Sequence, residues 1–544
     1  MVHPKAGTLP EKKDLANIPE LVSMYYIIRP SIDNEQQNVV FGTSGHRGSS
    51  LNGSFNEDHI AAITQAICNY RKNMNINGPL FIGIDTHALS EPAFITAIEV
   101  LVSNGVDVMI SEGTRYTPTP VISNTILTFN RENSLIADGI VITPSHNPPQ
   151  DGGFKYNPPT GGPADTDITS FLEKEANNFI SDNLKSVKRT PFTKAIKSDK
   201  IKRFNYLKNY CDHLDNVIDL KLISSTGIKI GADALGGSGL DYYGYIADRY
   251  KLNIKVFNDY PDPTFSFMTL DKDGKIRMDC SSKYAMSSLI RLKDEFDIAV
   301  GNDPDFDRHG IVTKTGGLMN PNAYLAVASW YLFTHRTKWD KNLKIGKTLV
   351  SSAMIDKIAK SIGKDVYEVP VGFKWFVDGL LNGYLGFGGE ESAGGSFLDM
   401  SGNPWSTDKD GIIMSLLSAE ILARTGIDPY NHYLSFEEKF GKSYYIRLDV
   451  PSSPEERNKI KKLSPDDIKH NNIAGEKILE KLSYAKGNNA PIGGIKITTE
   501  NGWFAARPSG TEDIYKIYAE SFVSEDHLNR LVEEAKELIN KTIM

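Results

Sequence analysis

The chain has 544 residues, too many for a single hydrophobic core, and this length predicts about three or four domains. Hydrophobic residues make up 40% of the chain and charged residues 24%, which excludes a disordered protein. A formal net charge of -7 argues weakly against nucleic acid as the main partner, but it leaves room for a local basic pocket that binds an anionic small molecule.

The amino terminus and the cysteines indicate the cellular compartment in which we expect the protein. Residues 1–20 contain no apolar segment typical of a signal peptide, and no run of 18 apolar residues occurs in the chain, so we expect neither secretion nor membrane insertion. Cys68, Cys211 and Cys280 form no CxxC pair and are odd in number. We therefore expect buried free thiols in a reducing environment and predict a cytoplasmic protein.

Strand-like and helix-like segments alternate along most of the chain. Residues 78–87 predict a strand that runs into a loop, residues 91–105 a helix, and residues 106–113 the next strand. The same pattern recurs over residues 227–258 and again around residues 297–313. Strand–helix–strand units predict sheets with helices packed on both faces, so we expect an α/β fold.

Three such domains fit the chain, and a smaller domain follows them. We place similar α/β domains with mixed sheets at residues 1–203, 204–322 and 323–436. In residues 437–544, three strand-like runs separated by polar or glycine-rich turns precede a helix with one apolar stripe. The stripe consists of Leu528, Leu531, Val532, Ala535, Leu538 and Ile539. We predict a small α+β domain for this last part.

Loops at the ends of predicted strands are where open α/β sheets usually bind ligands, and four of them stand out. The first, FGTSGHRG at residues 41–48, combines three glycines with Arg47. Glycines let backbone N–H groups approach an anion closely, and the guanidinium adds charge. A tight turn with a solvated arginine explains this loop equally well.

The second loop, residues 143–163, places Ser145 beside His146 directly after the apolar run GIVI, with Lys155 further along. An ordinary serine turn is the plainer interpretation of such a residue. No GxSxG elbow surrounds Ser145, so a hydrolase triad is not indicated. A phosphorylated serine, by contrast, could pass on its phosphoryl group if the protein positions it and neutralises its charge.

The third loop carries three aspartates at alternate positions after a predicted strand, Asp303, Asp305 and Asp307. In an extended segment their side chains would project to one side and repel one another, so we expect a cation there. Oxygen ligands favour Mg²⁺, Mn²⁺ or Ca²⁺ over zinc. An EF-hand is excluded, because Arg308 and Lys314 stand where its loop needs Gly and Glu. A solvated acidic turn remains the alternative.

The fourth loop and the last domain offer polar groups for a sugar and a phosphate. Residues 386–396 hold Glu390, Glu391 and Ser392 among five glycines, which suits the hydroxyls of a polyol but also a flexible acidic turn. In the last domain, the groups that suit a phosphate monoester are a guanidinium, two hydroxyls and backbone amides, from Arg507, Ser509, Gly510 and Thr511.

Together and in this order, these motifs resemble those of the α-D-phosphohexomutase family over nearly the whole chain. TPSHNPP at residues 143–149 is similar to the family's phosphoserine loop, GNDPDFDR to its metal loop, GEESAG at 389–394 to its sugar-specificity loop and RPSGTE at 507–512 to its phosphate-binding loop. Residues 41–48 and 369–376 also resemble the family pattern. GEESAG resembles the glucose-directed phosphoglucomutases of bacteria more than the GEMSGH form of dual-specificity members.

The resemblance implies four domains around one central cleft and a reversible interconversion of glucose 1-phosphate and glucose 6-phosphate. A phosphorylated Ser145 would bind one Mg²⁺ per chain together with Asp303, Asp305 and Asp307. Transfer of the phosphoryl group would give glucose 1,6-bisphosphate, which also acts as an activator. This intermediate would turn around in the cleft and return its other phosphate to the enzyme.

The family's residue roles carry over to matching positions. Proton transfer would fall to Lys155, His146 or Lys374, while Arg308 would steady the phosphoryl oxygens and Arg47 is a further catalytic candidate. Sugar hydroxyls would be held by Glu390 and Ser392. The idle phosphate, which is the one not being transferred, would be held by Arg507, Ser509, Gly510 and Thr511. The partners would be small sugar phosphates, with no nucleic acid and no membrane, and the protein a monomer or homodimer. The alternatives are a mutase with dual mannose and glucose specificity, a non-catalytic phosphosugar-binding protein and a metal-dependent phosphatase.

Overall fold

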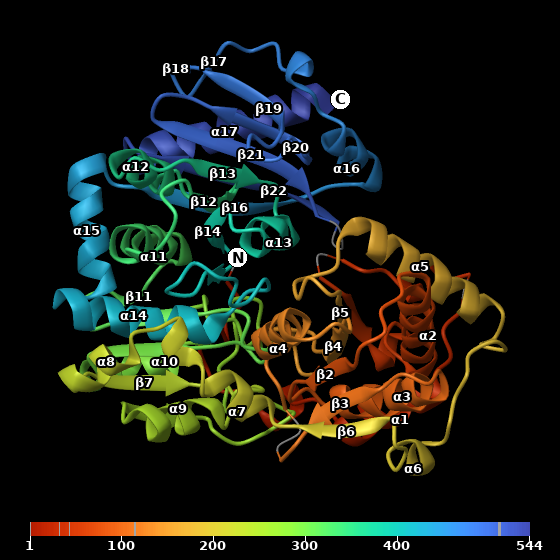
Figure 1. Ribbon diagram of the computed structural model, residues 1–544. Helices are drawn as coiled ribbons and strands as arrows, with labels where there is room; N and C mark the ends of the chain where they lie inside the picture. The colour runs from red at the N-terminus through yellow and green to blue at the C-terminus, as the bar shows by residue number, and fades with distance from the viewer. Residues whose placement is uncertain (1, 32, 43, 114–115, 510–512, 544) are drawn as a thin grey trace. The chain divides into compact units, whose positions relative to one another are not determined.

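Figure 1 shows the chain as a computed structural model, which describes residues 2–31, 33–42, 44–113, 116–509 and 513–543. The chain forms two compact units. The first comprises Met1–Met319, Phe376–Gly383 and Ser392–Asp428, and the second comprises Asn320–Trp375, Tyr384–Glu391 and Pro429–Met544. The chain therefore returns to the first unit twice after leaving it, and neither unit is one continuous segment.

The first unit begins with a six-stranded sheet in the order β1-β5-β4-β2-β3-β6. Its strands are β1 (His46–Ser49), β2 (Leu80–Ile84), β3 (Val108–Ser111), β4 (Asp138–Ile142), β5 (Asp151–Asn157) and β6 (Ile201–Phe204). β4, β2, β3 and β6 run parallel, whereas β5 and β1 are antiparallel to their neighbours. The sheet is thus mixed, as the sequence predicts.

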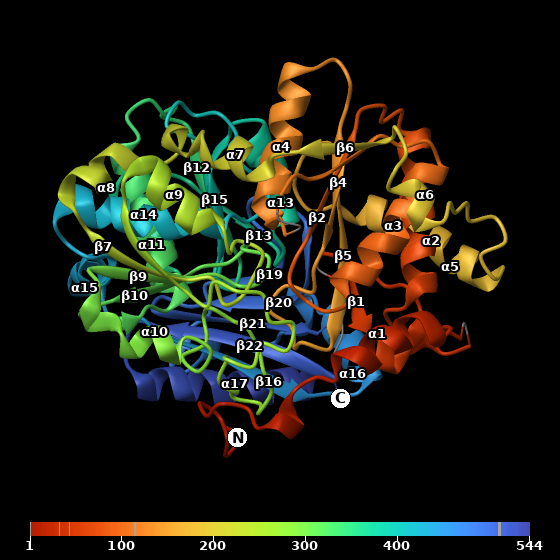
Figure 2. The same ribbon diagram turned by 90° about the horizontal axis from the view of Figure 1, so that it is seen from below.

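Helices cover both faces of this sheet (Figure 2). They are α2 (Glu57–Asn73), α3 (Ser90–Ser103), α4 (Thr119–Glu132) and α5 (Thr166–Ser181). Ile82 and Ile84 of β2 belong to the core that includes side chains of α2 and α3. The ring of Phe81, the residue before Ile82, packs against Phe129 of α4 with a centroid distance of 5.8 Å. Since β2 is buried on both faces, its sequence is a continuous apolar run rather than an alternating one.

A second sheet of the first unit has the strand order β11-β10-β9-β7-β8. Its strands are β7 (Lys229–Asp233), β8 (Asn253–Phe257), β9 (Ile298–Gly301), β10 (Gly310–Thr313) and β11 (Gly317–Leu318). The helices of this region are α8 (Leu220–Thr226), α9 (Tyr242–Tyr250), α10 (Ser287–Arg291) and α14 (Gly411–Thr425). β9 and β10 are adjacent and antiparallel, so the acidic loop connects two neighbouring strands of one sheet.

The second unit contains a group of parallel strands with β12 (Lys344–Thr348) between β13 (Val366–Val369) and β14 (Leu385–Glu390). The helices of this region are α11 (Pro321–His335), α12 (Met354–Ser361) and α15 (Pro429–Phe440). Shorter elements elsewhere in the chain are α1 (Ile18–Ile27), α6 (Phe192–Ala195), α7 (Tyr206–Cys211), α13 (Lys374–Leu381) and β15 (Gly394–Phe397).

The carboxyl-terminal part of the second unit is an antiparallel sheet in the order β16-β22-β21-β20-β19. Its elements are β16 (Tyr444–Pro451), α16 (Pro454–Lys461), β19 (Glu480–Tyr484), β20 (Pro491–Thr498), β21 (Gly502–Pro508), β22 (Ile514–Ser521) and α17 (Glu525–Ile543), with a hairpin of β17 (Asn472–Ile473) and β18 (Glu476–Lys477). The predicted apolar stripe of α17 is buried in the core of this sheet. The prediction of a small α+β region is therefore confirmed.

The three cysteines are buried and free of disulfides, as the sequence predicts. Within the described ranges, no helix is both long enough and apolar enough to cross a membrane.

Candidate active site

The serine of the second predicted loop lies at a sharp bend between two strands of the first sheet. β4 ends at Ile142 and β5 begins at Asp151, and Ser145 is buried between them, only 1% exposed. Its backbone has a φ of 60°, in the left-handed region that residues with a side chain seldom adopt. Such a conformation persists only where the surrounding structure imposes it, and it is frequent at functional sites.

The glycines after Ser145 allow the bend to pack against β5. A β-carbon on Gly153 would lie 2.0 Å from the carbonyl oxygen of Thr143, so no larger residue fits there. The backbone N–H of Thr143 donates to the carbonyl of Gly153 at 2.9 Å. Gly153 thus allows the segment before Ser145 to pack directly against β5.

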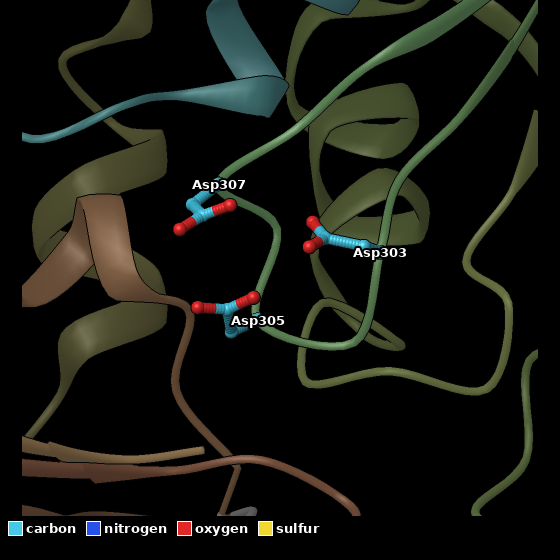
Figure 3. Close-up of side chains that lie close together, drawn as sticks. All are labelled: Asp303, Asp305 and Asp307. Atoms are coloured by element: carbon cyan, nitrogen blue, oxygen red, sulfur yellow. The ribbon is translucent and has the colours of Figure 1, made fainter. Parts of the chain in front are cut away.

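The three predicted metal ligands lie together in the first unit. The carboxylates of Asp303, Asp305 and Asp307 are buried, each offers an oxygen within 4.8 Å of the others, and Figure 3 shows them facing a common space. The prediction that this segment is extended is wrong. Phe306 N–H donates to the carbonyl of Asp303 at 2.8 Å and closes a turn, with φ of 58° at Phe306. The turn, rather than an extended strand, gathers the carboxylates.

The donor set fits a hard divalent cation. Oδ1 of Asp305 and Oδ1 of Asp307 are buried and have no hydrogen-bond partner among the described residues. Burial and the neighbouring Asp305 and Asp307 raise the pKa of Asp303 well above its ordinary value. A buried group of carboxylates with unpaired oxygens is costly without a counter-charge, and an oxygen-binding cation such as Mg²⁺ would supply it.

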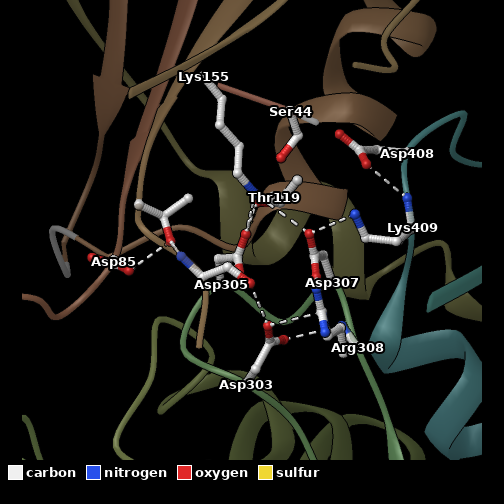
Figure 4. Close-up of polar contacts among 12 residues, drawn as sticks. Ser44, Asp85, Thr119, Lys155, Asp303, Asp305, Asp307, Arg308, Asp408 and Lys409 are labelled. Carbon is white, nitrogen blue, oxygen red and sulfur yellow. Dashed lines mark hydrogen bonds and ion pairs between the residues drawn. The ribbon is translucent and has the colours of Figure 1, made fainter. Parts of the chain in front are cut away.

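Basic side chains surround the acidic cluster (Figure 4). Nζ of Lys155 lies 2.6 Å from Asp305 and 3.4 Å from Asp307, and Nζ of Lys409 lies 3.0 Å from Asp307. Nε of Arg308 lies 3.9 Å from Asp303 and 3.7 Å from Asp307. Burial alone would raise the pKa of Asp307, but Lys409 and Lys155 outweigh it and hold that pKa below its ordinary value. The site therefore combines carboxylates that suit a cation with ammonium and guanidinium groups that suit an anion.

Ser145 reaches this cluster directly. Its Oγ donates to Oδ2 of Asp303 at 2.9 Å and lies 3.2 Å from Nδ1 of His146. Burial, together with the charges of Arg308 and Arg47, lowers the pKa of His146 to about 3 and leaves the imidazole neutral. Arg47 contacts the same loop, because its guanidinium donates to Oδ1 of Asn147 at 3.4 Å.

The other predicted site residues belong largely to the second unit. Oε1 of Glu390 accepts from the backbone N–H of Gly372 at 3.0 Å, close in sequence to Lys374 at the start of α13. Arg507 lies near the end of β21, opposite Lys516 of β22. Its charge also acts on Tyr518 of β22, whose pKa burial and Glu391 raise to about 12. Ser509 donates its N–H to the carbonyl of Ile514 at 2.9 Å. Ser392 is half-buried in the first unit. Gly510 and Thr511 lie outside the described residues.

Two residues of the acidic site, Lys409 and Thr119, were not predicted from the sequence. Lys409 stands just before α14 in the run TDKDG, where a lysine between two aspartates was the available signal. Thr119 begins α4 and donates from Oγ1 to Oδ2 of Asp305 at 2.8 Å. Nothing near Thr119 in the sequence indicates this contact, because its partner lies 186 positions away.

Models of the four domains of one protein family match the chain, in the order of the domains. They are the phosphoglucomutase/phosphomannomutase alpha/beta/alpha domains I (residues 38–181), II (208–317) and III (320–440) and the C-terminal domain (446–538). The chain therefore belongs to the phosphoglucomutase/phosphomannomutase family. The family and the fold class predicted from the sequence are confirmed.

Individual relatives show which members of the family the chain is similar to. The chain is 55% identical over 540 residues to a phosphoglucomutase of Komagataeibacter xylinus, an alignment that covers 99% of this chain and 97% of that protein. It is 28% identical over 505 residues to a probable phosphoglucosamine mutase of Pyrococcus horikoshii, covering 92% and 98% of the two chains. The solved open form of parafusin (phosphoglucomutase) from Paramecium matches with a TM-score of 0.74 at 19% identity over 95% of each chain, which shows the shared fold.

Proposed function

We propose that this protein is a phosphoglucomutase, which interconverts glucose 1-phosphate and glucose 6-phosphate through a phosphorylated Ser145. The observation that carries the proposal is the 2.9 Å hydrogen bond from Ser145 to Asp303, at a buried acidic cluster with unpaired oxygens. The relative named phosphoglucomutase, at 55% identity over almost the full chain, supports glucose phosphates as substrates.

We infer that Mg²⁺ is the cofactor. Asp303, Asp305 and Asp307, with an oxygen of the phosphoryl group on Ser145, would hold the ion, and the unpaired carboxylate oxygens suit it. When bound, Mg²⁺ neutralises negative charge on the phosphoryl oxygens during transfer.

The chain's own side chains would handle protons and the remaining charge. As the bond between phosphorus and Oγ of Ser145 breaks, a hydroxyl oxygen of the sugar bonds to phosphorus and its proton passes to the protein. The imidazole of His146 is neutral and lies 3.2 Å from Oγ of Ser145, but a pKa lowered to about 3 makes it a weak base and so the weaker candidate for accepting that proton. Burial would lower the pKa of Lys155, but Asp305 outweighs it, so that the ammonium stays charged and can donate a proton to the departing Oγ of Ser145. Lys374 is the further candidate for proton transfer.

The second half of the reaction needs the bisphosphate to turn and return its other phosphate to Ser145. We propose that Glu390 and Ser392 hold sugar hydroxyls in both orientations. The idle phosphate would be held by Arg507, Ser509, Gly510 and Thr511, while Arg308 and Arg47 steady the transferring group. We place this reaction in the cytoplasm, in a monomer or homodimer, and propose four domains with boundaries near residues 203, 322 and 436.

A coupled assay tests the proposal. Glucose 6-phosphate should form from glucose 1-phosphate in the presence of Mg²⁺, faster when glucose 1,6-bisphosphate is added, and without release of inorganic phosphate. Release of phosphate without isomerisation would instead support a phosphatase, and binding without either reaction a phosphosugar-binding protein. Equal kcat/KM values for glucose 1-phosphate and mannose 1-phosphate would replace the glucose preference by dual specificity.

A further inference from the structure

Two buried side chains behind the serine loop have no part in the chemistry described above. Asp85 and His87 follow β2, and both are 1% exposed. Asp85 appears beside the acidic cluster in Figure 4 without belonging to it. From the sequence alone, both residues are expected only to lie in the loop after a strand. They are, however, hydrogen-bonded to Thr143 and Asn147, which stand on either side of Ser145 in the sequence.

The first connection reaches Ser145 from the amino-terminal side. Oγ1 of Thr143 donates to Oδ2 of Asp85 at 2.6 Å. The same Oγ1 accepts the backbone N–H of Ser145 at 2.8 Å. One hydroxyl thus links the carboxylate to the peptide group whose conformation sets the direction of the serine side chain. All of these groups are buried, so water does not compete for the bonds.

The second connection reaches the loop from the carboxyl-terminal side. Nδ1 of His87 lies 2.8 Å from Oδ2 of Asp85, and Nε2 of His87 lies 3.0 Å from the carbonyl oxygen of Asn147. Both ring nitrogens face acceptors, so the imidazole must carry a proton on each to make both bonds. In agreement, burial would lower the pKa of His87 but the carboxylate of Asp85 outweighs it and raises that pKa.

The segment between the two connections is the one that requires support. Ser145 adopts φ of 60°, which is strained for a residue with a β-carbon and would relax in an unrestrained loop. Thr143 and Asn147 stand two positions before and two after this residue, and both are bonded to the Asp85–His87 pair. The pair therefore fixes both ends of the five-residue segment that contains the strained residue.

We propose that Asp85 and His87 are positioning residues for phosphoryl transfer, which hold residues 143–147 so that Oγ of Ser145 faces Asp303. This inference rests on the proposed function for its effect on turnover. Neither residue contacts the acidic cluster, so they act through the loop and not on the reacting atoms. Misplacement of a reacting group by about 1 Å can cost a hundredfold in rate, and small rotations of this loop would have that consequence.

Two variants cut the two connections separately. His87→Gln removes the ring that joins Asp85 to the carbonyl of Asn147, while Thr143→Val removes the hydroxyl but leaves the Asp85–His87 pair intact. Thr143→Ser keeps the hydroxyl and serves as the conservative counterpart. The matched control is His59→Gln, which alters an equally buried histidine of α2 that bonds to the carbonyl of Gln37 at 2.8 Å and to no residue of the serine loop.

For each variant we would measure kcat, KM and the rate at which glucose 1,6-bisphosphate phosphorylates Ser145, with intact mass as the readout of phosphorylation. Amide hydrogen exchange of the peptide that contains residues 143–147 would report on the conformation of the loop. In His87→Gln and Thr143→Val we expect kcat and the phosphorylation rate to fall about ten- to a hundredfold, with KM changed less than about threefold and faster exchange in that peptide. Thr143→Ser should restore most of the rate, and His59→Gln should change neither the rate nor the exchange of this peptide.

Unchanged exchange of residues 143–147 in both His87→Gln and Thr143→Val would overturn the proposal, as would an equal loss of rate in His59→Gln. A failure of the proposed function has a different signature. In that case the wild-type protein itself would show neither turnover nor phosphorylation, while the exchange data would still decide whether Asp85 and His87 hold the loop.

Discussion

Oγ of Ser145 donates a hydrogen bond of 2.9 Å to Oδ2 of Asp303, although 158 positions separate the two residues in the sequence. The bond joins the loop after β4 of the first sheet to the loop after β9 of the second sheet. Because both sheets belong to one compact unit, the hydroxyl and the acidic cluster are held together by the fold itself.

Replacement of Ser145 should abolish turnover. Ser145→Ala removes the hydroxyl that would carry the phosphoryl group, and no water molecule can form the same covalent intermediate. We expect less than roughly a hundredth of the wild-type rate, with the thermal unfolding temperature nearly unchanged. The coupled assay and calorimetry measure these quantities, and intact mass should show no added phosphate. A variant that retains more activity would exclude the covalent relay.

Replacement of Asp305 should act mainly through the cation. Oδ2 of Asp305 accepts from Lys155 and Thr119, while Oδ1 is unpaired among the described residues. Asp305→Asn exchanges an anionic ligand for a neutral one of the same size, so more Mg²⁺ should be needed for half-maximal activity and the maximal rate should fall about tenfold or more. Asp408→Asn, at a buried aspartate outside the cluster, should leave the Mg²⁺ requirement unchanged. An unaltered requirement in Asp305→Asn would remove Asp305 from the metal site.

The parts of this site that depend on local pattern could be predicted from the sequence. A hydroxyl at the end of a buried strand and three carboxylates at alternate positions after another strand are visible within a few residues of chain. The three carboxylates do lie together, but the geometric reason predicted for this was wrong, since a turn closed by Phe306 and not an extended segment brings them together. Such a turn needs a left-handed residue at Phe306, for which a phenylalanine gives no signal.

Contacts between distant segments could not be predicted in the same way. Thr119 and Asp305 are 186 positions apart, and Asp85 and Thr143 are 58 apart. These pairs are set by strand order, in which β4 lies beside β2, and by the packing of neighbouring loops. A single threonine or histidine in a loop has many possible partners, so only the tertiary structure selects one.

The second unit contains a buried ion cluster whose effect on stability should depend on pH. Oε2 of Glu368 lies 2.7 Å from Nζ of Lys496 and 3.3 Å from Nζ of Lys347. Burial alone would raise the pKa of Glu368, but the two ammonium groups lower it from 4.5 to about 2. A carboxylate with a lowered pKa stabilises the fold fully above pH 4.5, and the stabilisation disappears as the pH falls toward 2.

Glu368→Gln should therefore destabilise the protein by about 3–5 kcal/mol near pH 7, because it leaves the buried ammonium of Lys496 without a carboxylate and that of Lys347 with Asp356 alone. The difference from wild type should shrink as the pH is lowered from about 4.5 to about 2. Urea unfolding across this range measures it. The control is Glu480→Gln, at a largely exposed pair with Lys486, which should cost less than about 1 kcal/mol at any pH. A difference that does not vary with pH would contradict the assignment.

The last prediction concerns Arg507, half-buried near the end of β21. If this residue holds the idle phosphate, it must accept the 1-phosphate in one pose of the sugar and the 6-phosphate in the other. A comparison of kcat/KM in the two directions cannot test this role. The overall equilibrium is fixed by the two sugar phosphates, so any mutation lowers both directions by the same factor.

Arg507→Ala can change how firmly the bisphosphate is retained while it turns. Loss of a charge-assisted contact worth about 1.5–3 kcal/mol would speed its escape about ten- to a hundredfold. Each escape leaves Ser145 unphosphorylated and the enzyme inactive, so the variant should lose activity progressively during turnover and regain it on addition of glucose 1,6-bisphosphate. Arg530→Ala, at an exposed arginine of α17 in the same region, should show steady progress curves like wild type. Steady curves in Arg507→Ala, with no greater demand for the bisphosphate, would show that retention of the intermediate depends on other residues.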